Sequence, residues 1–128
     1  MRRFILALTL SVTASTGVAW AQDAANGEEV FKKCRACHQI GETAKNGVGP
    51  LMNAIIGRKS GLIEGFNYSE ANKNSGLTWD KATFLNYIKD PKAAMPGTKM
   101  AFAGVKDEKD AADLFAYLEQ FGPGGKKK

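Results

Sequence analysis

The segment Cys34–His38 constrains this chain more than any other feature, because it holds both cysteines and the only histidine. A disulfide between cysteines three positions apart would close too short a loop to organise a fold. A structural zinc site needs four Cys or His ligands, and the chain has two Cys and one His. A thioredoxin-like redox pair should open a helix after a strand, whereas a helix-forming segment precedes this pair. These three interpretations are therefore excluded.

The remaining interpretation uses the imidazole beside the second thiol. C-x-x-C-H is the attachment sequence of c-type haem, in which both thiols form thioethers with the vinyl groups. Cys34 and Cys37 would hold one haem c covalently, and His38 would ligate its iron. A cofactor also suits the size of the chain, because a domain of about a hundred residues with 14 glycines has a small core of its own.

An iron ligated by one histidine needs a sixth ligand or keeps an open position. The chain has no second histidine, so methionine is the available ligand, and a His/Met pair raises the reduction potential into the carrier range. Met52 follows a Gly-Pro pair, and we interpret it as packing. Met95 precedes a proline, which favours extended backbone, whereas Met100 ends a loop that could return to the iron. The chemistry favours Met100 over Met95 but leaves both open.

A series of short motifs runs in order and without gaps along residues 24–121. They are Gly27 and Phe31, Cys34–His38, Gly49-Pro50, Gly57-Arg58-Lys59, Phe66-Asn67-Tyr68, Asn72-Lys73-Asn74, Gly76-Leu77-Thr78-Trp79, Pro96-Gly97-Thr98-Lys99-Met100, and Leu114 with Ala116-Tyr117-Leu118. Each motif is weak alone. As an ordered set they resemble the class I cytochromes c, of the bacterial cytochrome c2 type that is similar to the mitochondrial protein.

This resemblance implies roles for individual residues. His38 and Met100 would be the axial ligands of the iron, and the Pro50 carbonyl would accept a hydrogen bond from the imidazole and fix its orientation. The resemblance further implies that Arg58, Tyr68 and Trp79 surround a buried haem propionate, that Asn72, Tyr87 and Thr98 lie beside the methionine, and that Gly27 and Phe31 pack on Leu114 and Tyr117.

The pattern and the resemblance predict a small all-α domain with about three main helices, a short one, and long loops wrapped around the haem. Between residues 41 and 76 the sequence is rich in Gly, Asn and Ser and shows no strand alternation, so we expect loops there. The predicted helices are residues 24–33 with Asp23 as N-cap, residues 78–89 with Thr78 as N-cap and Pro91 beyond the end, and a segment that opens at Asp107, where Leu114, Tyr117, Leu118 and Phe121 recur at helical spacing.

The start of the chain predicts export. Two arginines precede an apolar stretch, and Ala19-Trp20-Ala21 fits a signal-peptidase site, so residues 1–21 are interpreted as a cleavable signal peptide for the periplasm. The alternative, a retained membrane anchor, is disfavoured because the apolar run is too short to span a bilayer. The cytochrome c domain is predicted over residues 22–122, followed by a flexible Gly- and Lys-rich tail over residues 123–128.

The formal charge of +5 comes from the ends of the chain. Without Arg2, Arg3 and the three terminal lysines, basic and acidic residues are equal in number. By the resemblance, lysines ring the haem edge of a monomer and steer it to acidic patches on membrane redox complexes. Cytochrome bc1 would be the donor, and a terminal oxidase or a photosynthetic reaction centre the acceptor; nucleic acid is not expected as a partner. The predicted docking lysines are Lys32, Lys33, Lys45, Lys92, Lys99 and Lys106.

These inferences favour a one-electron carrier without enzymatic activity, since the sequence shows no acid–base pair or nucleophile pattern. A haem enzyme or gas sensor with an open sixth position is the alternative function. That alternative predicts a weak or absent methionine ligand, and Met100 in its Pro-Gly-Thr-Lys context argues against it.

Overall fold

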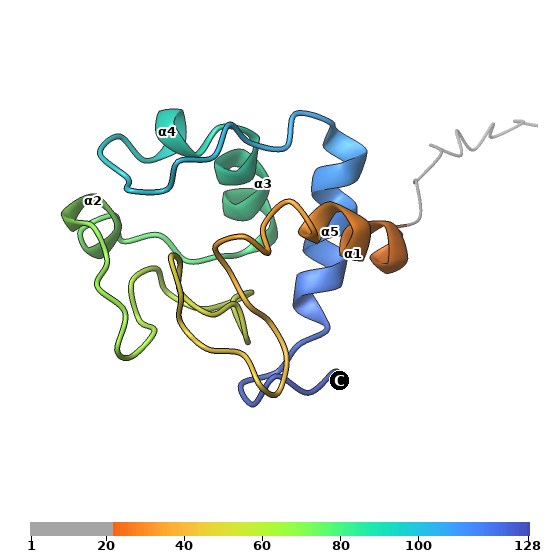
Figure 1. Ribbon diagram of the computed structural model, residues 1–128. Coiled ribbons are helices and arrows are strands. Elements are labelled where there is room, and N and C mark those ends of the chain that lie inside the picture. Colours follow the sequence, from red (N-terminus) through yellow and green to blue (C-terminus); the bar gives the residue numbers. More distant parts are fainter. Residues whose placement is uncertain (1–21) are drawn as a thin grey trace, which may run out of the picture.

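The computed structural model describes residues 22–128, and Figure 1 shows helices joined by long irregular loops. The helices of this part of the chain are α1 (Ala24–Phe31), α2 (Glu70–Lys73), α3 (Lys81–Lys89), α4 (Pro91–Ala94) and α5 (Glu108–Glu119). Within the same residues, β-structure is limited to isolated bridges. The predicted all-α class with three main helices is confirmed, and two short helices replace the one expected.

The predicted signal peptide, residues 1–21, lies outside the described residues. Among residues 22–128, no helix is both long enough and apolar enough to cross a membrane.

Each main helix begins at an aspartate whose carboxylate accepts hydrogen bonds from backbone N–H groups of the first turn. Asp23 accepts two such bonds at 3.0 and 3.1 Å, and Asp107 accepts one at 2.8 Å. The predicted cap of the middle helix, Thr78, is wrong, because Asp80 occupies that position and accepts at 2.8 Å. Thr78 instead pairs with Lys59 in an antiparallel bridge, and this pairing lies before the start of the helix.

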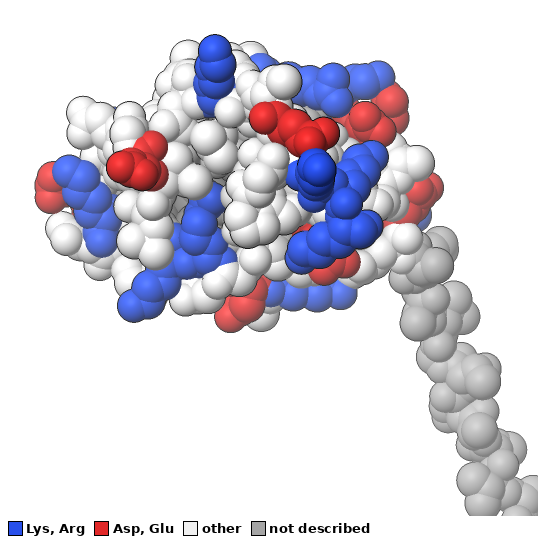
Figure 2. All heavy atoms as spheres, turned by 90° about the horizontal axis from the view of Figure 1, so that it is seen from below, with Lys and Arg blue, Asp and Glu red and all other residues white. Residues whose placement is uncertain are grey.

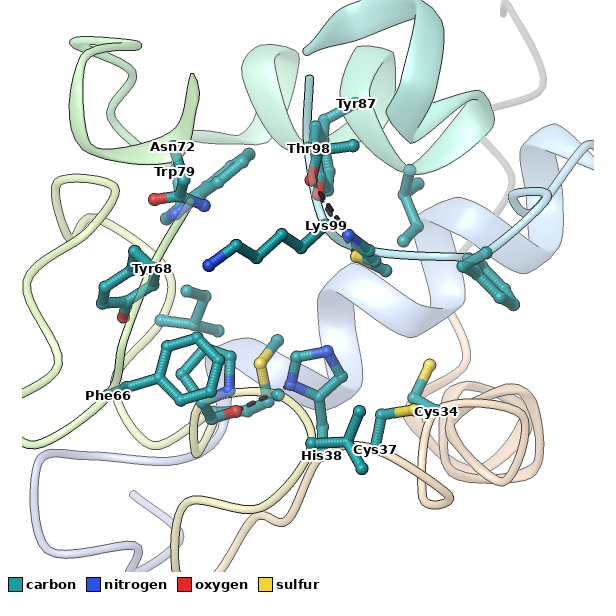
Figure 3. Close-up of a pocket in the computed structure, with 18 of the residues that line it drawn as sticks. Cys34, Cys37, His38, Phe66, Tyr68, Asn72, Trp79, Tyr87, Thr98 and Lys99 are labelled. Atoms are coloured by element: carbon teal, nitrogen blue, oxygen red, sulfur yellow. Dashed lines mark hydrogen bonds between the residues drawn. The ribbon is translucent and has the colours of Figure 1, made fainter. Parts of the chain in front are cut away.

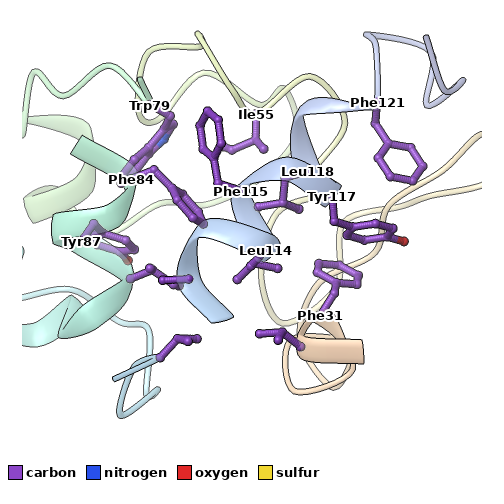
Figure 4. Close-up of a cluster of buried hydrophobic side chains, with 14 of the residues drawn as sticks. Phe31, Ile55, Trp79, Phe84, Tyr87, Leu114, Phe115, Tyr117, Leu118 and Phe121 are labelled. Atoms are coloured by element: carbon purple, nitrogen blue, oxygen red, sulfur yellow. The ribbon is translucent and has the colours of Figure 1, made fainter. Parts of the chain in front are cut away.

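Helix α1 packs across α5, and the closest approach is at Gly27. A Cβ at this position would collide with the backbone carbonyl of Asp113 and lie 2.8 Å from Tyr117 Cβ, so the crossing requires glycine. Phe31 packs on Tyr117 with ring centroids 5.5 Å apart, and Leu114 is only 1% exposed beside them (Figure 4). The predicted packing of the first helix on the last is therefore confirmed.

A buried carboxylate joins the same two helices. Asp113 of α5 is 1% exposed and accepts hydrogen bonds from the Asp23 backbone N–H at 2.8 Å, Asn26 Nδ2 at 2.8 Å and Lys109 Nζ at 2.6 Å. Burial by itself would raise the pKa of Asp113, but these three hydrogen bonds outweigh it and hold the pKa below its ordinary value. The carboxylate is therefore ionised at neutral pH and links the start of α1 to α5.

Aromatic side chains connect α3 to α5 and close the core. Phe84 lies 5.9 Å from Phe115 between ring centroids, and Trp79 meets Tyr87 edge to face at 4.8 Å. Helix α3 ends before Pro91, as predicted, and α4 begins with that proline, where its missing N–H costs no helical hydrogen bond.

The last residues of the chain fold back on the domain, although the sequence predicts a flexible tail there. The Gly122 N–H donates to the Lys126 carbonyl at 2.9 Å, and the Lys128 N–H donates to the Gln120 carbonyl at 2.8 Å. Lys127 Nζ lies over the aromatic ring of Phe121, 5.7 Å from its centre. These contacts form a turn that lies against α5 and the loop after α1 (Figure 1).

Candidate functional site

A cavity of about 530 Å³ lies between the loop after α1, the long loops that lead to α2, the inner face of α3 and the segment 98–102. Its wall is mostly apolar, with side chains such as Phe84, Ile88 and Leu118 at the back. Figure 3 shows polar groups reaching into it from several loops. The cavity is lined by every site residue predicted from the sequence: Cys34, Cys37, His38, Pro50, Arg58, Tyr68, Asn72, Trp79, Tyr87, Thr98 and Met100.

Both cysteines lie in the turn that follows α1. The backbone N–H groups of Cys37 and His38 donate to the Cys34 carbonyl at 3.1 and 2.8 Å, which brings the two thiols and the imidazole to one side of the cavity (Figure 3). Neither cysteine is in a disulfide. Burial raises the pKa of the Cys34 thiol to about 11, with the charge of Lys33 opposing the shift, whereas Cys37 is exposed.

The imidazole of His38 is oriented by a single backbone oxygen. His38 Nδ1 lies 2.7 Å from the Pro50 carbonyl. Because a carbonyl only accepts hydrogen bonds, Nδ1 carries the proton and Nε2 keeps a free lone pair. Burial lowers the pKa of His38, against the opposing effect of this hydrogen bond, so the ring is neutral at neutral pH. A neutral imidazole with one fixed tautomer is the form that ligates a metal.

Gly49 makes room for this ring, a role that the sequence analysis missed. A Cβ at Gly49 would lie 2.7 Å from His38 Nδ1 and still closer to Cε1, so a larger residue would displace the imidazole. The only local signal is the adjacent proline, which marks a turn but does not show what packs against it.

Met100 reaches the cavity from the segment after α4, and α3 meets it there. The Tyr87 hydroxyl donates to Met100 Sδ at 3.2 Å, and the Met100 N–H donates to Thr98 Oγ1 at 3.2 Å. Burial raises the pKa of Tyr87, with a hydrogen bond donated by the Thr98 side chain opposing the shift, so the phenol stays protonated and able to donate. The thioether is thus held by a hydroxyl on one helix and by its own loop.

The other two methionines of the described residues differ in environment. Met95 is 3% exposed, belongs to the hydrophobic core and does not line the cavity. Met52 is half-buried, packs against the core and lines the cavity, but its sulfur has no hydrogen bond from a described residue. The geometry therefore brings Met100 to the site and leaves Met95 out of it.

Arg58 places a half-buried cation on the cavity wall. Its Nη1 donates to the Asn53 carbonyl at 2.8 Å, while its Nε is buried with no hydrogen-bond partner among the described residues. A buried donor left unpaired costs about 1–3 kcal/mol, so this atom calls for a hydrogen-bond acceptor in the cavity. Burial lowers the pKa of Arg58, with Tyr68 opposing the shift, and the guanidinium remains charged at neutral pH.

Three further predicted side chains are held along the loops of the same cavity. The Tyr68 hydroxyl accepts a hydrogen bond from the Ile63 N–H at 3.1 Å. The Asn72 side-chain oxygen accepts one from the Ser60 hydroxyl at 2.8 Å. Trp79 is buried at the end of the bridge that precedes α3. These contacts position polar tips at the wall although the surrounding backbone is irregular.

Charged and apolar groups share the edge of the cavity. Lys33 and Lys99 line it, and Lys99 extends across it in Figure 3. Val48 also lines it and is 79% exposed. Figure 2 shows one face of the molecule, on which basic side chains lie among acidic ones.

Two of the six predicted docking lysines are engaged within the domain. Lys32 pairs with a glutamate of α1 at 2.7 Å, and Lys106 Nζ donates to the carbonyl at the end of α3 at 2.7 Å. Among the described residues, the other four form no ion pair; they are Lys33, Lys45, Lys92 and Lys99.

Comparison with known proteins shows the family of this chain. The profile of the cytochrome c family matches residues 24–122. The chain belongs to the cytochrome c family. It is 58% identical over 128 residues to cytochrome c2 of Blastochloris viridis, a match that covers 100% of both chains. Cytochrome c2 of Rhodoplanes tepidamans is 64% identical over 107 residues, which are 84% of this chain and 100% of the relative. The solved structure of cytochrome c2 from Rhodospirillum centenum has a TM-score of 0.74 at 42% identity and covers 79% of this chain and 99% of that one.

These matches support a bacterial class I cytochrome c of the c2 type, an electron carrier with one covalently attached haem c. The cavity fits that group on its own evidence. A cysteine pair lies beside a neutral, oriented imidazole, the wall is apolar enough for a porphyrin, and the unpaired Arg58 Nε suits a haem carboxylate.

Proposed function

We propose that this cytochrome is a periplasmic one-electron carrier whose haem iron is ligated by His38 and Met100. The observation that carries the proposal is that both side chains line one cavity and each is oriented by a hydrogen bond. Pro50 holds His38 Nδ1 at 2.7 Å, and Tyr87 holds Met100 Sδ at 3.2 Å. Two pre-oriented ligands favour a closed iron site over an open one.

When bound, the haem supplies an iron that accepts and releases one electron. Cys34 and Cys37 would tether it by thioether bonds beside His38. The Pro50 carbonyl keeps the proton on Nδ1 and so leaves the Nε2 lone pair for the metal. The soft Met100 thioether and the buried, mostly apolar wall favour the reduced state and raise the potential. The chain needs no proton donor or nucleophile for this role.

The remaining polar residues would bind the cofactor through its edge. Arg58, Tyr68 and Trp79 are proposed to surround a propionate, which gives the unpaired Arg58 Nε an acceptor. Asn72, with Tyr87 and Thr98, is proposed to tune the methionine side of the site. An apolar cavity strengthens each of these electrostatic contacts.

The proposed partners are membrane redox complexes that meet the protein at the cavity edge, with cytochrome bc1 as donor and a terminal oxidase or photosynthetic reaction centre as acceptor. Lys33 and Lys99 are best placed to steer them, because they line the cavity and form no ion pair among the described residues. We expect Lys33→Glu to slow electron exchange with cytochrome bc1 at low salt and to flatten its salt dependence. Lys81→Glu, which makes the same charge change outside the cavity lining, is the control. It should leave the rate of electron exchange and its salt dependence unchanged. Equal effects of the two variants would exclude a docking role for the edge.

Export is proposed from residues 1–21, which would be removed by signal peptidase. Mass spectrometry of the protein from the periplasmic fraction should show a chain that starts at Gln22 and carries one haem. A haem protein that still contains residues 1–21 would contradict this prediction and would support a membrane-tethered carrier.

The optical spectrum of the purified protein tests the ligand pair. The oxidised protein should show the weak near-infrared band that reports iron bound to a thioether sulfur. Met100→Ala should abolish this band, whereas the control Met52→Leu, which also changes a methionine of the cavity wall, should keep it. If the band disappears in Met52→Leu but persists in Met100→Ala, then Met52 is the ligand and the assignment of Met100 is wrong.

The alternative function, a haem enzyme or gas sensor, makes the opposite prediction for the unmodified protein. If the oxidised form lacks the near-infrared band and the reduced form binds carbon monoxide readily, the sixth position is open. The carrier function would then be rejected in favour of a ligand-binding one.

A further inference from the structure

We propose that Asn53 is a positioning residue for the haem site and that the C-terminal cap, residues 121–128, holds it in place. The inference rests on the proposed roles of His38 as iron ligand and Arg58 as a haem contact. It goes beyond them by naming what fixes both groups. The turn at the end of the chain, which the sequence predicts to be a flexible tail, thereby acquires a function.

The side chain of Asn53 closes the loop that carries His38. Two backbone hydrogen bonds of 2.8 and 2.9 Å join residues 37–39 to residues 49–52. Beyond them, the Gly41 N–H donates to Asn53 Oδ1, and Asn53 Nδ2 donates to the Gly41 carbonyl, both at 2.9 Å. An amide is needed for this two-point contact, because it alone offers a donor and an acceptor side by side. The pairing prevents the two segments from sliding past each other.

The backbone of the same residue anchors Arg58. The Asn53 carbonyl accepts the hydrogen bond from Arg58 Nη1 at 2.8 Å, and Asn53 is only 7% exposed. A shift of residue 53 would therefore move the His38 loop and the guanidinium together. Arg58 lines the cavity that would hold the haem, and a positive charge there would favour the reduced iron, so a retreat of the guanidinium would lower the reduction potential.

The C-terminal cap covers this pairing. Gly125 is buried and has φ of +79°, and a Cβ on it would collide with the Gly41 carbonyl and lie 2.7 Å from Asn53 Nδ2. The turn is kept by the hydrogen bonds of Gly122 to Lys126 at 2.9 Å and of Lys128 to Gln120 at 2.8 Å. Because the turn lies on the Asn53–Gly41 pair, it keeps water away from these hydrogen bonds, which strengthens them.

The neighbouring glycines provide a matched test in the mature, haem-loaded protein. Gly125→Ala should lift the cap, whereas Gly124→Ala introduces a Cβ that meets no atom within 4 Å. We expect Gly125→Ala to accelerate hydrogen exchange of the Gly41 amide by about tenfold, the equivalent of one weakened hydrogen bond, and to lower the reduction potential. Gly124→Ala should change neither quantity.

A second variant removes the contact at its other end. Asn53→Leu keeps the site uncharged but loses both side-chain hydrogen bonds, so it should also lower the reduction potential. In this background, adding Gly125→Ala should cause no further change in the potential. Exchange of α5 amides distinguishes positioning from general destabilisation. The proposal is overturned if Gly125→Ala leaves Gly41 exchange and the potential unchanged, or if it accelerates the α5 amides as much as Gly41. Absence of the near-infrared band in the unmodified protein would instead reject the ligand assignment and leave the exchange result interpretable.

Discussion

Replacement of Asp113 by asparagine tests how the first and last helices are held together. The wild-type carboxylate accepts the Asp23 N–H on Oδ1 and both Asn26 Nδ2 and Lys109 Nζ on Oδ2. An asparagine has one oxygen, so it can keep the bond from Asp23 only by turning its own NH2 group toward the two other donors. The change is nearly isosteric, which keeps the packing of α1 on α5 intact and isolates the hydrogen bonds.

The expected loss of stability is set mainly by Asn26, because its bond to the buried carboxylate lies at the helix interface. A hydrogen bond to a charged group contributes about 1.5–3 kcal/mol. The bond from Lys109 adds little, because half of the lysine side chain is exposed to water, which screens its charge. We therefore expect Asp113→Asn to lower the free energy of unfolding by about 2 kcal/mol at neutral pH.

The pH dependence gives the prediction a second, independent signature. The folded-state pKa of Asp113 is lowered, so its stabilisation is complete above the unfolded pKa of about 4 and disappears as the pH falls through the folded pKa. Asparagine does not titrate. The difference between wild type and variant should therefore be largest at neutral pH and shrink in acid.

Denaturant unfolding of the haem-loaded protein at a series of pH values measures both effects. Asp110→Asn is the control, since Asp110 accepts from the same Asn26 at 3.0 Å but is only half-buried, and its replacement retains an acceptor oxygen. This control should change the stability by no more than about 0.5 kcal/mol. An Asp113→Asn effect that is constant from neutral pH into acid, or no larger than that of the control, would refute the reasoning.

Three further changes test single contacts or backbone angles. Gly27→Ala should destabilise the protein by about 1–3 kcal/mol in denaturant unfolding, because its Cβ collides with α5; no loss would show that the helices can separate at no cost. Ala54→Gly should stabilise the protein by about 0.5 kcal/mol in the same assay. Ala54 has φ of +51°, which strains a residue with a Cβ, and the relief of this strain exceeds the entropy that glycine loses on folding. Tyr87→Phe should lower the reduction potential measured by redox titration, because the hydroxyl no longer draws electron density from Met100 Sδ; an unchanged potential would exclude that influence.

The helices show how far sequence patterns extend. Periodicity and capping predict the existence of α1, α3 and α5, because both depend on residues within a few positions of each other. The ends are less certain, and the cap of α3 at Asp80 instead of Thr78 shows why. Thr78 is used in a bridge with Lys59, a contact between residues far apart in sequence that no local pattern reports.

The site divides in the same way. The attachment motif predicts a covalent haem because the spacing of two thiols and an imidazole is itself the chemical requirement, and the resemblance to a known family supplies the other side chains that line the cavity. The roles of Gly49 and Asn53 were not predicted, because these residues act through the space they leave or through the backbone they hold.

Patterns among residues that are close in sequence thus predict the cofactor, the all-α class and the three main helices. The tertiary structure decided which nitrogen of His38 carries the proton, which methionine meets the Tyr87 hydroxyl, and that the last residues cover Asn53. These outcomes depend on distances between segments that come together only when the chain closes around the cavity. A single sequence does not contain such distances in any local form.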